Sequence, residues 1–145
     1  MDRIFSLPIE LNKNRTIDRD TLQNLYDESD AVLVTTGAHL TKRVPYPGGK
    51  RILSGLQFLM DINDGKPMDL IGREVVIIGA GNVEMDMACE SWRLGAKKVT
   101  TIDIQKPLAF GKELDLATSL GTEILWPKQI EKVTSTSIYL TDKTG

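Results

Sequence analysis

The sequence is poor in the residues that build disulfides and metal sites. Among 145 residues there is one cysteine, Cys89, and one histidine, His39. A single cysteine excludes an internal disulfide, a Cys-x-x-Cys redox pair and a set of iron–sulfur ligands. A lone histidine without suitably spaced partners argues against a metal centre. We therefore predict no metal site in this chain, and we interpret Cys89 as a small buried residue rather than a nucleophile.

The chain also lacks a strong charge bias and long apolar runs. The net charge is −2, and no apolar stretch approaches the roughly 20 residues of a membrane span. The N-terminus has no secretory pattern. These features give no indication of a nucleic-acid partner or a membrane span. We predict a cytoplasmic protein, in keeping with its low cysteine content.

The most informative stretch is formed by residues 74–104. An apolar run at 74–78 leads into the glycine loop, residues 79–81, and a helix-compatible segment then extends to Gly95. A second apolar run, residues 99–104, carries Asp103. The order of strand, glycine turn, helix, strand and acid is that of a dinucleotide-binding βαβ unit.

Each of these residue types has a physical role in such a unit. Gly79 permits a tight turn out of the strand, and Gly81 lets the backbone approach a pyrophosphate because it has no Cβ. The N–H groups and the positive end of the helix dipole then face that anion. Asp103, about 20 residues further on, can accept hydrogen bonds from a ribose diol. At Glu84, where glycine or alanine is usual, we expect a bulky acid to widen the packing or repel a phosphate.

The predicted nucleotide-binding residues are Gly79, Ala80, Gly81, Asn82, Val83, Asp103, Gln105 and Lys106. For Asn82 two roles remain open, a helix cap and a contact with phosphate or ribose. Asp103 would repel a 2′-phosphate, and no arginine follows it closely, so we predict that NAD(H) is preferred over NADP(H). No set of catalytic side chains is evident, and hydride transfer needs none because the cofactors supply the chemistry.

The remaining segments predict an α/β fold: a Rossmann-type parallel sheet flanked by helices, with a short β-rich C-terminal extension. Helices are predicted at 17–26, capped by Thr16 or Asp18, at 54–62, capped by Ser54, and at 111–120; strands are predicted at 31–36 and 124–126. Residues 130–140 alternate like a strand, and residues 141–145 have the composition of a hairpin turn.

Several motifs together resemble a known family. They are Val34-Thr35-Thr36-Gly37-Ala38, Ser54-Gly55-Leu56-Gln57-Phe58-Leu59, Gly79-Ala80-Gly81-Asn82-Val83-x-Met85-Asp86 and Arg93-Leu94-Gly95-Ala96. Over roughly residues 20–130 the chain resembles the small (beta) subunit of glutamate synthase and its relatives. These are FAD-dependent NAD(P)H oxidoreductases with two dinucleotide-binding domains.

The resemblance implies a role for each half of the chain. Residues 1–66 would be the C-terminal return of a flavin domain plus a linker helix, with Thr36 and Gly37 close to the flavin nucleotide. Residues 67–145 would be the NAD(P)-binding domain, truncated at its C-terminus. The nicotinamide would pass hydride to FAD. Electrons would then leave through an iron–sulfur or other acceptor on another segment or subunit.

The chain also departs from that family pattern. It has no earlier Gly-x-Gly loop for FAD, no N-terminal cysteine cluster, and Glu84 in place of the usual alanine. We therefore expect a piece of a larger protein whose isolated form is inactive. The alternative is a non-catalytic βαβ interaction or regulatory module that has lost nucleotide binding, and Glu84 is the residue that favours it.

Overall fold

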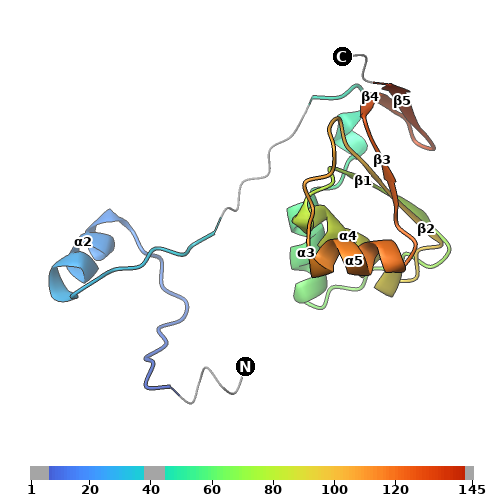
Figure 1. The fold of residues 1–145 in the computed structure, drawn as a ribbon. Coiled ribbons are helices and arrows are strands. Elements are labelled where there is room, and N and C mark those ends of the chain that lie inside the picture. The colour runs from blue at the N-terminus through green and yellow to red at the C-terminus, as the bar shows by residue number, and fades with distance from the viewer. Residues whose placement is uncertain (1–6, 38–44, 143–145) are drawn as a thin grey trace. The chain divides into compact units, whose positions relative to one another are not determined.

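The computed structural model describes residues 7–37 and 45–142, which belong to two compact units, Met1–Gly37 and Ala38–Gly145 (Figure 1). His39 lies outside the described residues. Within residues 7–37 the regular element is helix α2, Arg19–Glu28. Its N-cap is Asp18, whose carboxylate accepts the backbone N–H of Thr21 at 2.8 Å. The predicted helix and the Asp18 cap are thus confirmed, with the helix lying about one half-turn further along the chain.

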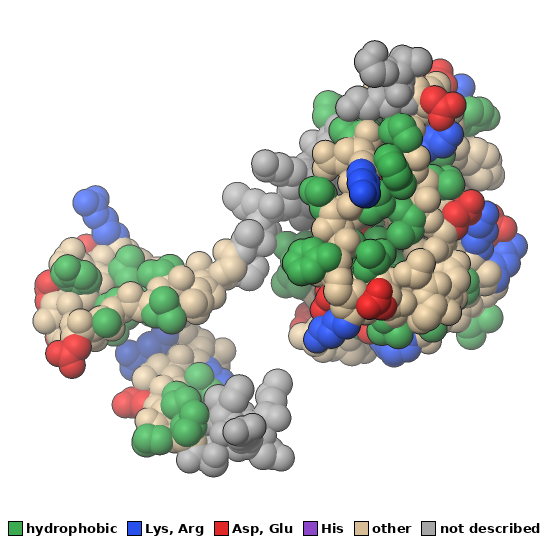
Figure 2. Space-filling model, viewed as in Figure 1, with side chains coloured by type: hydrophobic (Ala, Val, Ile, Leu, Met, Phe, Trp, Pro, Cys, Tyr) green, Lys and Arg blue, Asp and Glu red, His purple; other side chains and the backbone are tan. Residues whose placement is uncertain are grey.

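The predicted strand at residues 31–36 is not formed. Residues 31–37 have no regular secondary structure, and Leu33 is 87% exposed. Figure 2 shows hydrophobic side chains over the surface of this unit. A strand requires a neighbour that completes its backbone hydrogen bonds, and the described part of the N-terminal unit contains no other strand. The β-branched composition of the segment is therefore not sufficient by itself to form a strand.

The second unit is built on a parallel sheet of three strands. These are β1 (Glu74–Ile78), β2 (Lys98–Ile102) and β3 (Glu123–Leu125), arranged in the order β1-β2-β3. Helix α4 (Asn82–Arg93) connects β1 to β2, and helix α5 (Lys112–Ser119) connects β2 to β3. The predicted α/β fold with a parallel sheet and flanking helices is confirmed. The third strand was predicted at 124–126, and it ends one residue earlier, at Leu125.

The core lies between this sheet and helix α4. Met85 and Ala88 on α4 and Val99 on β2 are fully buried, and Ile77 on β1 joins them. Alternate residues of a strand face opposite sides of its sheet, so Ile77 and Val99 face the helix while their neighbours face away. Helix α5 adds the buried Ala117 to the same cluster. Burial of these side chains holds the βαβ unit in register.

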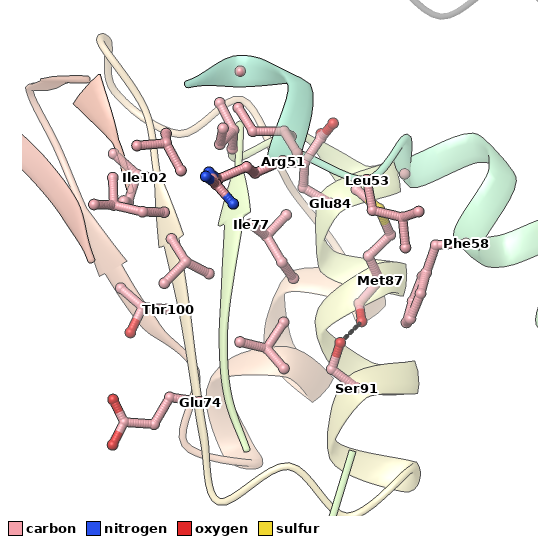
Figure 3. A pocket seen from close by; sticks show the side chains of 18 of the residues that line it. Arg51, Leu53, Phe58, Glu74, Ile77, Glu84, Met87, Ser91, Thr100 and Ile102 are labelled. Atoms are coloured by element: carbon pink, nitrogen blue, oxygen red, sulfur yellow. Dashed lines mark hydrogen bonds between the residues drawn. The ribbon is translucent and has the colours of Figure 1, made fainter. Parts of the chain in front are cut away.

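Helix α3 (Gly55–Asn63) extends the core on the other side of α4. Ser54 caps it by accepting the N–H of Gln57 at 3.4 Å, as predicted. Phe58 is buried and lies beside Met87 of α4 (Figure 3). Gly55 permits this contact, because a Cβ there would lie 2.4 Å from the Met87 sulfur. The segment that carries α3 therefore packs with the sheet unit, and its assignment to a flavin domain stays a prediction.

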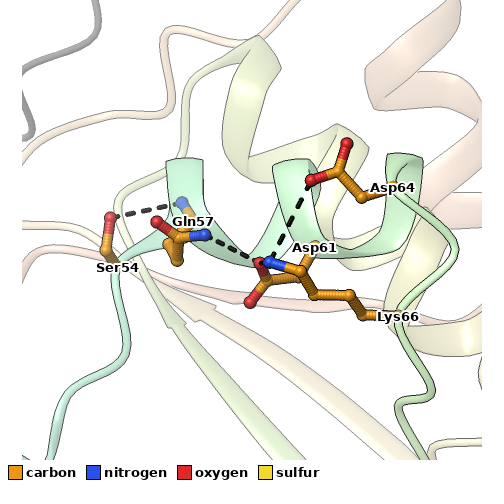
Figure 4. A network of polar contacts seen from close by, with 5 residues as sticks. All are labelled: Ser54, Gln57, Asp61, Asp64 and Lys66. Atoms are coloured by element: carbon orange, nitrogen blue, oxygen red, sulfur yellow. Dashed lines mark hydrogen bonds and ion pairs between the residues drawn. The ribbon is translucent and has the colours of Figure 1, made fainter.

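A polar network fastens the C-terminal end of α3 (Figure 4). The Lys66 ammonium lies 2.6 Å from Asp61 Oδ1, and the Gln57 amide donates to the same oxygen at 2.7 Å. These two donors, Lys66 above all, lower the pKa of the Asp61 carboxyl below its usual range. The same contact raises the pKa of Lys66.

Replacing Lys66 by methionine should raise the pKa of Asp61 toward its ordinary value, because the main donor to its carboxylate is removed. A lowered pKa means that Asp61 stabilises the fold above its unfolded pKa and loses this effect as the pH falls through the folded value. The Lys66→Met variant should therefore lose less stability than the parent on acidification below about pH 5. An NMR titration of the Asp61 carboxyl carbon measures the shift. Lys106→Met is the control, and an unchanged Asp61 titration would contradict the assignment.

The C-terminal extension is an antiparallel hairpin of β4 (Lys128–Val133) and β5 (Ile138–Asp142). Its turn lies at residues 134–137, where Thr134 N–H donates to the Ser137 carbonyl at 2.8 Å. The predicted turn at 141–145 is not formed at 141 and 142, which belong to β5, and 143–145 lie outside the described residues. Residues 134–137 hold no glycine or asparagine, so the turn chemistry that usually marks a tight hairpin is absent.

Candidate nucleotide-binding site

The glycine loop leaves the carboxyl end of β1 and opens helix α4. Gly79 has φ +113°, a conformation that side chains strongly disfavour. Gly81 is the N-cap of α4 with φ −95° and ψ −177°, which is extended backbone open to any residue. The two glycines therefore act differently. Gly79 is required by the turn, whereas Gly81 keeps space free beside the first backbone N–H groups of the helix.

Asp103 joins the glycine loop to the end of β2. Its Oδ2 accepts the Ala80 N–H at 2.9 Å, and its Oδ1 accepts the Gln105 N–H at 3.1 Å. Its backbone continues the sheet, with Asp103 N–H donating to the Leu125 carbonyl at 3.0 Å. The structure thus brings together three predicted site residues, Ala80, Asp103 and Gln105. Asp103 is a half-buried side chain at the carboxyl ends of two neighbouring strands, which is where nucleotides bind in such sheets.

The segment after Asp103 is clamped against the glycine loop. The Ala80 carbonyl accepts the N–H groups of Leu108 and Ala109, each at 3.0 Å. The Asn82 side chain pairs with Phe110: the Phe110 N–H donates to Asn82 Oδ1 at 3.0 Å, and Asn82 Nδ2 donates to the Phe110 carbonyl at 3.3 Å. Asn82 is therefore not the helix cap that one of its two predicted roles required. Asn82 Nδ2 also lies 3.4 Å from Glu113 Oε2, and both partners are 28 or more residues away, so no local sequence pattern marks these contacts.

Glu84 lies over the glycine loop. Its Oε2 accepts the Gly81 N–H at 3.0 Å, which forms the glutamate half of a capping box. A Cβ on Gly79 would lie 2.9 Å from Glu84 Cγ, and a Cβ on Gly81 would lie 2.9 Å from Oε2. Glu84 folds back onto the loop, rather than pushing α4 away from it. A glutamate three residues after an N-cap is the sequence signal that indicates this arrangement.

This geometry fits an anion at the glycine loop. A carboxylate already accepts the Gly81 N–H at the positive end of the α4 dipole. When the Glu84 carboxylate moves away, the Gly81 N–H can donate to one oxygen of a pyrophosphate instead. For a flavin nucleotide the described residues do not fit in this way, because 7–37 contain no strand, glycine loop and helix in sequence.

The other predicted site residues are more exposed. Val83 is 53% exposed on the first turn of α4. Lys106 is exposed and forms no ion pair within the part of the chain that the structure describes. Thr36 and Gly37 belong to the N-terminal unit, so the candidate site consists of residues of the second unit. Their predicted place near a flavin stays a prediction.

A cavity of about 1500 Å³ reaches Glu84, whose side chain covers the glycine loop. It is lined by Val83 and Glu84 at that end, by the short helix η1 (Gly49–Arg51) and by the start of α3, and it reaches β1 and β2. Figure 3 shows Arg51, Ile77, Glu84 and Ile102 among the side chains around it. Arg51 supplies a positive charge to this cavity, and the sequence carries no signal that singled it out. Because Glu84 lines this cavity, its side chain has room to move away from the loop.

Cys89 lies on α4 and is half-buried. Burial is the main cause that raises the pKa of its thiol, and the carboxylates of Asp86 and Glu90 raise it further. A raised pKa leaves less of the reactive thiolate at neutral pH. The environment agrees with the interpretation of Cys89 as a packing residue.

Comparison with known proteins shows the family. A model of the pyridine nucleotide-disulphide oxidoreductases matches residues 9–144. The chain belongs to this family. A similar member, the NADP(+)-dependent formate dehydrogenase subunit beta of Moorella thermoacetica, is 33% identical over 107 residues, which cover 70% of this chain and 15% of that protein.

Two further relatives of the chain differ in name and length. Glutamate synthase [NADH] of Schizosaccharomyces pombe is 28% identical over 107 residues, covering 66% of the chain and 5% of that protein. The NAD-dependent dihydropyrimidine dehydrogenase subunit PreT of Escherichia coli is 29% identical over 127 residues, which cover 85% of this chain and 31% of that protein. The chain spans less than a third of each relative. A relationship to glutamate synthase is thus found, whereas membership of its small-subunit group stays a prediction.

Proposed function

We propose that this chain is the NAD(P)H-binding portion of a flavin-dependent oxidoreductase. It would hold the nicotinamide for hydride transfer to FAD, which the rest of a larger protein would bind. Electrons would then pass to another subunit or segment, as in glutamate synthase-like enzymes. The observation that carries the proposal is the Gly81 N–H at the start of α4, with Asp103 at the end of the neighbouring strand. Membership of the oxidoreductase family supports it.

The proposed roles follow from the positions of the residues. The pyrophosphate would lie against residues 79–83, and the adenosine ribose would lie near Asp103, Gln105 and Lys106. When the nucleotide and flavin are bound, they supply the redox chemistry. The residues of this chain would bind and orient the dinucleotide. The part of the chain that the structure describes has no helix with the length and apolar character of a membrane span, and a cytoplasmic location remains our prediction.

A titration with NADH tests the proposal directly. We expect NADH to bind the 145-residue chain saturably. Calorimetry, or quenching of the fluorescence of Trp92 and Trp126, measures this binding. Circular dichroism shows whether the sample is folded. An absence of binding up to millimolar NADH in a folded sample would contradict the proposal.

A second candidate function is a non-catalytic βαβ module for interaction or regulation. The observation that favours it is Glu84, whose carboxylate already takes the Gly81 N–H. Such a module would not bind NADH while the Glu84 carboxylate occupies the Gly81 N–H. Saturable binding of NADH by the unmodified chain would therefore exclude this second candidate.

The choice between NAD(H) and NADP(H) depends on Asp103. We expect the unmodified chain to bind NADH roughly tenfold more tightly than NADPH, because the Asp103 carboxylate repels a 2′-phosphate. In Asp103→Ser this preference should fall toward parity. Affinity for both nucleotides should also decrease, since the Ala80 N–H loses its acceptor. Parallel calorimetric titrations measure both effects.

Asp115→Ser is the matched control, because Asp115 is an exposed acid on α5 and its loss changes the net charge equally. This control should keep the preference for NADH. Tighter binding of NADPH than NADH by the unmodified chain would show that Asp103 does not face the ribose. Lys106 would then be the residue to replace next. The names of the relatives include NADP, NADH and NAD, so they favour neither nucleotide.

A further inference from the structure

The side chain of Glu84 fills the space that the glycine loop leaves open. Oε2 lies 3.0 Å from the Gly81 nitrogen. Cγ and Cδ lie 2.9 and 3.0 Å from the point where a Cβ on Gly79 would be. One carboxylate of the chain itself therefore covers both glycines.

A dinucleotide requires this same space. In a βαβ unit the pyrophosphate approaches the backbone at the second glycine and accepts N–H groups at the start of the helix. We propose that the Glu84 carboxylate is an internal substitute for the pyrophosphate. The Glu84 side chain has to leave the glycine loop before a dinucleotide binds. The inference rests on the nucleotide-binding function proposed above. It identifies Glu84 as the residue that sets the affinity of this site for ligands containing a pyrophosphate.

Electrostatics makes the two anions compete. The single N–H of Gly81 cannot serve both oxygens fully, and like charges a few ångströms apart repel in a partly buried site. Glu84 is absent from the salt bridges formed by the described residues, so no side-chain cation neutralises it there. The cavity bordered by Glu84 offers room for the displaced side chain, and Arg51 lines that cavity.

The competition has a specific consequence for ligand classes. NADH and ADP-ribose both contain a pyrophosphate, and both have to displace Glu84. Adenosine has no phosphate, so its binding near Asp103 does not require Glu84 to move. A change at Glu84 should therefore alter the affinity for the first two ligands and leave the third unaffected.

The experiment compares four forms of the full chain: the parent, Glu84→Ala, Glu84→Gln and Asp86→Asn. Glutamine at this position of a capping box retains the hydrogen bond to the N-cap but removes the charge. Asp86 is an exposed acid on the same helix, so Asp86→Asn controls for the loss of one negative charge. NADH, ADP-ribose and adenosine are each titrated by calorimetry, and circular dichroism checks the fold of every form.

We expect Glu84→Ala to bind NADH and ADP-ribose roughly tenfold more tightly than the parent, because an occupied anion position becomes vacant. Glu84→Gln should show a smaller gain. Asp86→Asn should resemble the parent, and adenosine should bind all four forms alike. Binding by Glu84→Ala where the parent shows none would support the competition by Glu84 and would contradict the function proposed for the unmodified chain.

Three results would overturn the inference. If the parent binds NADH at least as tightly as both Glu84 variants, Glu84 does not compete, and the proposed function stands without this device. If no folded form binds NADH, both the inference and the proposed function fail. An equal gain in Asp86→Asn would attribute the effect to net charge, which also overturns the inference.

Discussion

Gly81→Val should abolish saturable NADH binding and leave the fold intact. The backbone of Gly81 has φ −95° and ψ −177°, which valine adopts without strain. The added Cβ would meet Glu84 Oε2 at 2.9 Å, and this is the far end of a flexible side chain. The rest of the valine side chain would lie where the pyrophosphate approaches the loop. We expect an affinity loss of at least about a hundredfold, since charge-assisted hydrogen bonds to the phosphate are prevented.

The neighbouring glycine provides the contrast for this prediction. Gly79 has φ +113°, and a Cβ there would lie 2.9 Å from Glu84 Cγ. Gly79→Ala should therefore lower the free energy of unfolding by about 1–3 kcal/mol through backbone strain. Gly81→Val should lose only the Glu84 cap, about 1 kcal/mol. Thermal melts and NADH titrations separate the two effects, and NADH binding by Gly81→Val at the parental affinity would show that the glycine loop is not the site.

Gly48→Ala should destabilise the second unit strongly. Gly48 has φ +81°, and a Cβ on it would lie 1.9 Å from the Val133 carbonyl oxygen. The Val133 N–H donates to the Pro47 carbonyl at 2.8 Å, so backbone contacts hold β4 beside this turn. Neither the turn at Gly48 nor β4 can move away without breaking the hydrogen bond between Val133 and Pro47. We expect the free energy of unfolding to fall by about 3 kcal/mol or more, combining left-handed strain with a steric overlap.

Gly65→Ala is the matched control for Gly48→Ala. Gly65 also has a positive φ, +71°, but a Cβ there meets no atom within 4 Å. It should lose only about 1 kcal/mol, which is the strain of the backbone alone. Urea denaturation of both variants measures the difference, which isolates the clash with Val133. Equal losses would mean that the close approach of Gly48 to β4 does not contribute to stability.

The order of elements around the glycine loop could be predicted because its signals are local. An apolar run of strand length, a glycine turn and a helix with a glycine stop each depend on a few consecutive residues. The caps Asp18 and Ser54 were predictable for the same reason, since a cap satisfies backbone groups two or three residues away. Parallel pairing of β1 with β2 then follows from the βαβ connection.

Elements that depend on distant partners could not be predicted in this way. Residues 31–36 have a strand composition, yet no neighbouring strand completes their hydrogen bonds in the described N-terminal unit. The hairpin turn at 134–137 is set by the pairing of Ile130 with Leu140 and of Val133 with Ile138. The turn residues themselves give no comparable signal. Long-range pairing decided both cases.

For the candidate site, the sequence by itself determined which residues form the glycine loop and which acid follows the second strand of the unit. Gly79, Gly81 and Asp103 follow from the spacing of a βαβ unit, and the tertiary structure brings Asp103 to the loop through the Ala80 N–H. Only the tertiary structure decided what the polar side chains do there. Asn82 turns to the backbone of Phe110, and Glu84 turns to Gly81. The partner of Asn82 lies 28 residues away, so local sequence cannot reveal it, whereas Glu84 satisfies a half-buried N–H only three residues before it because unpaired polar groups are unfavourable inside a fold.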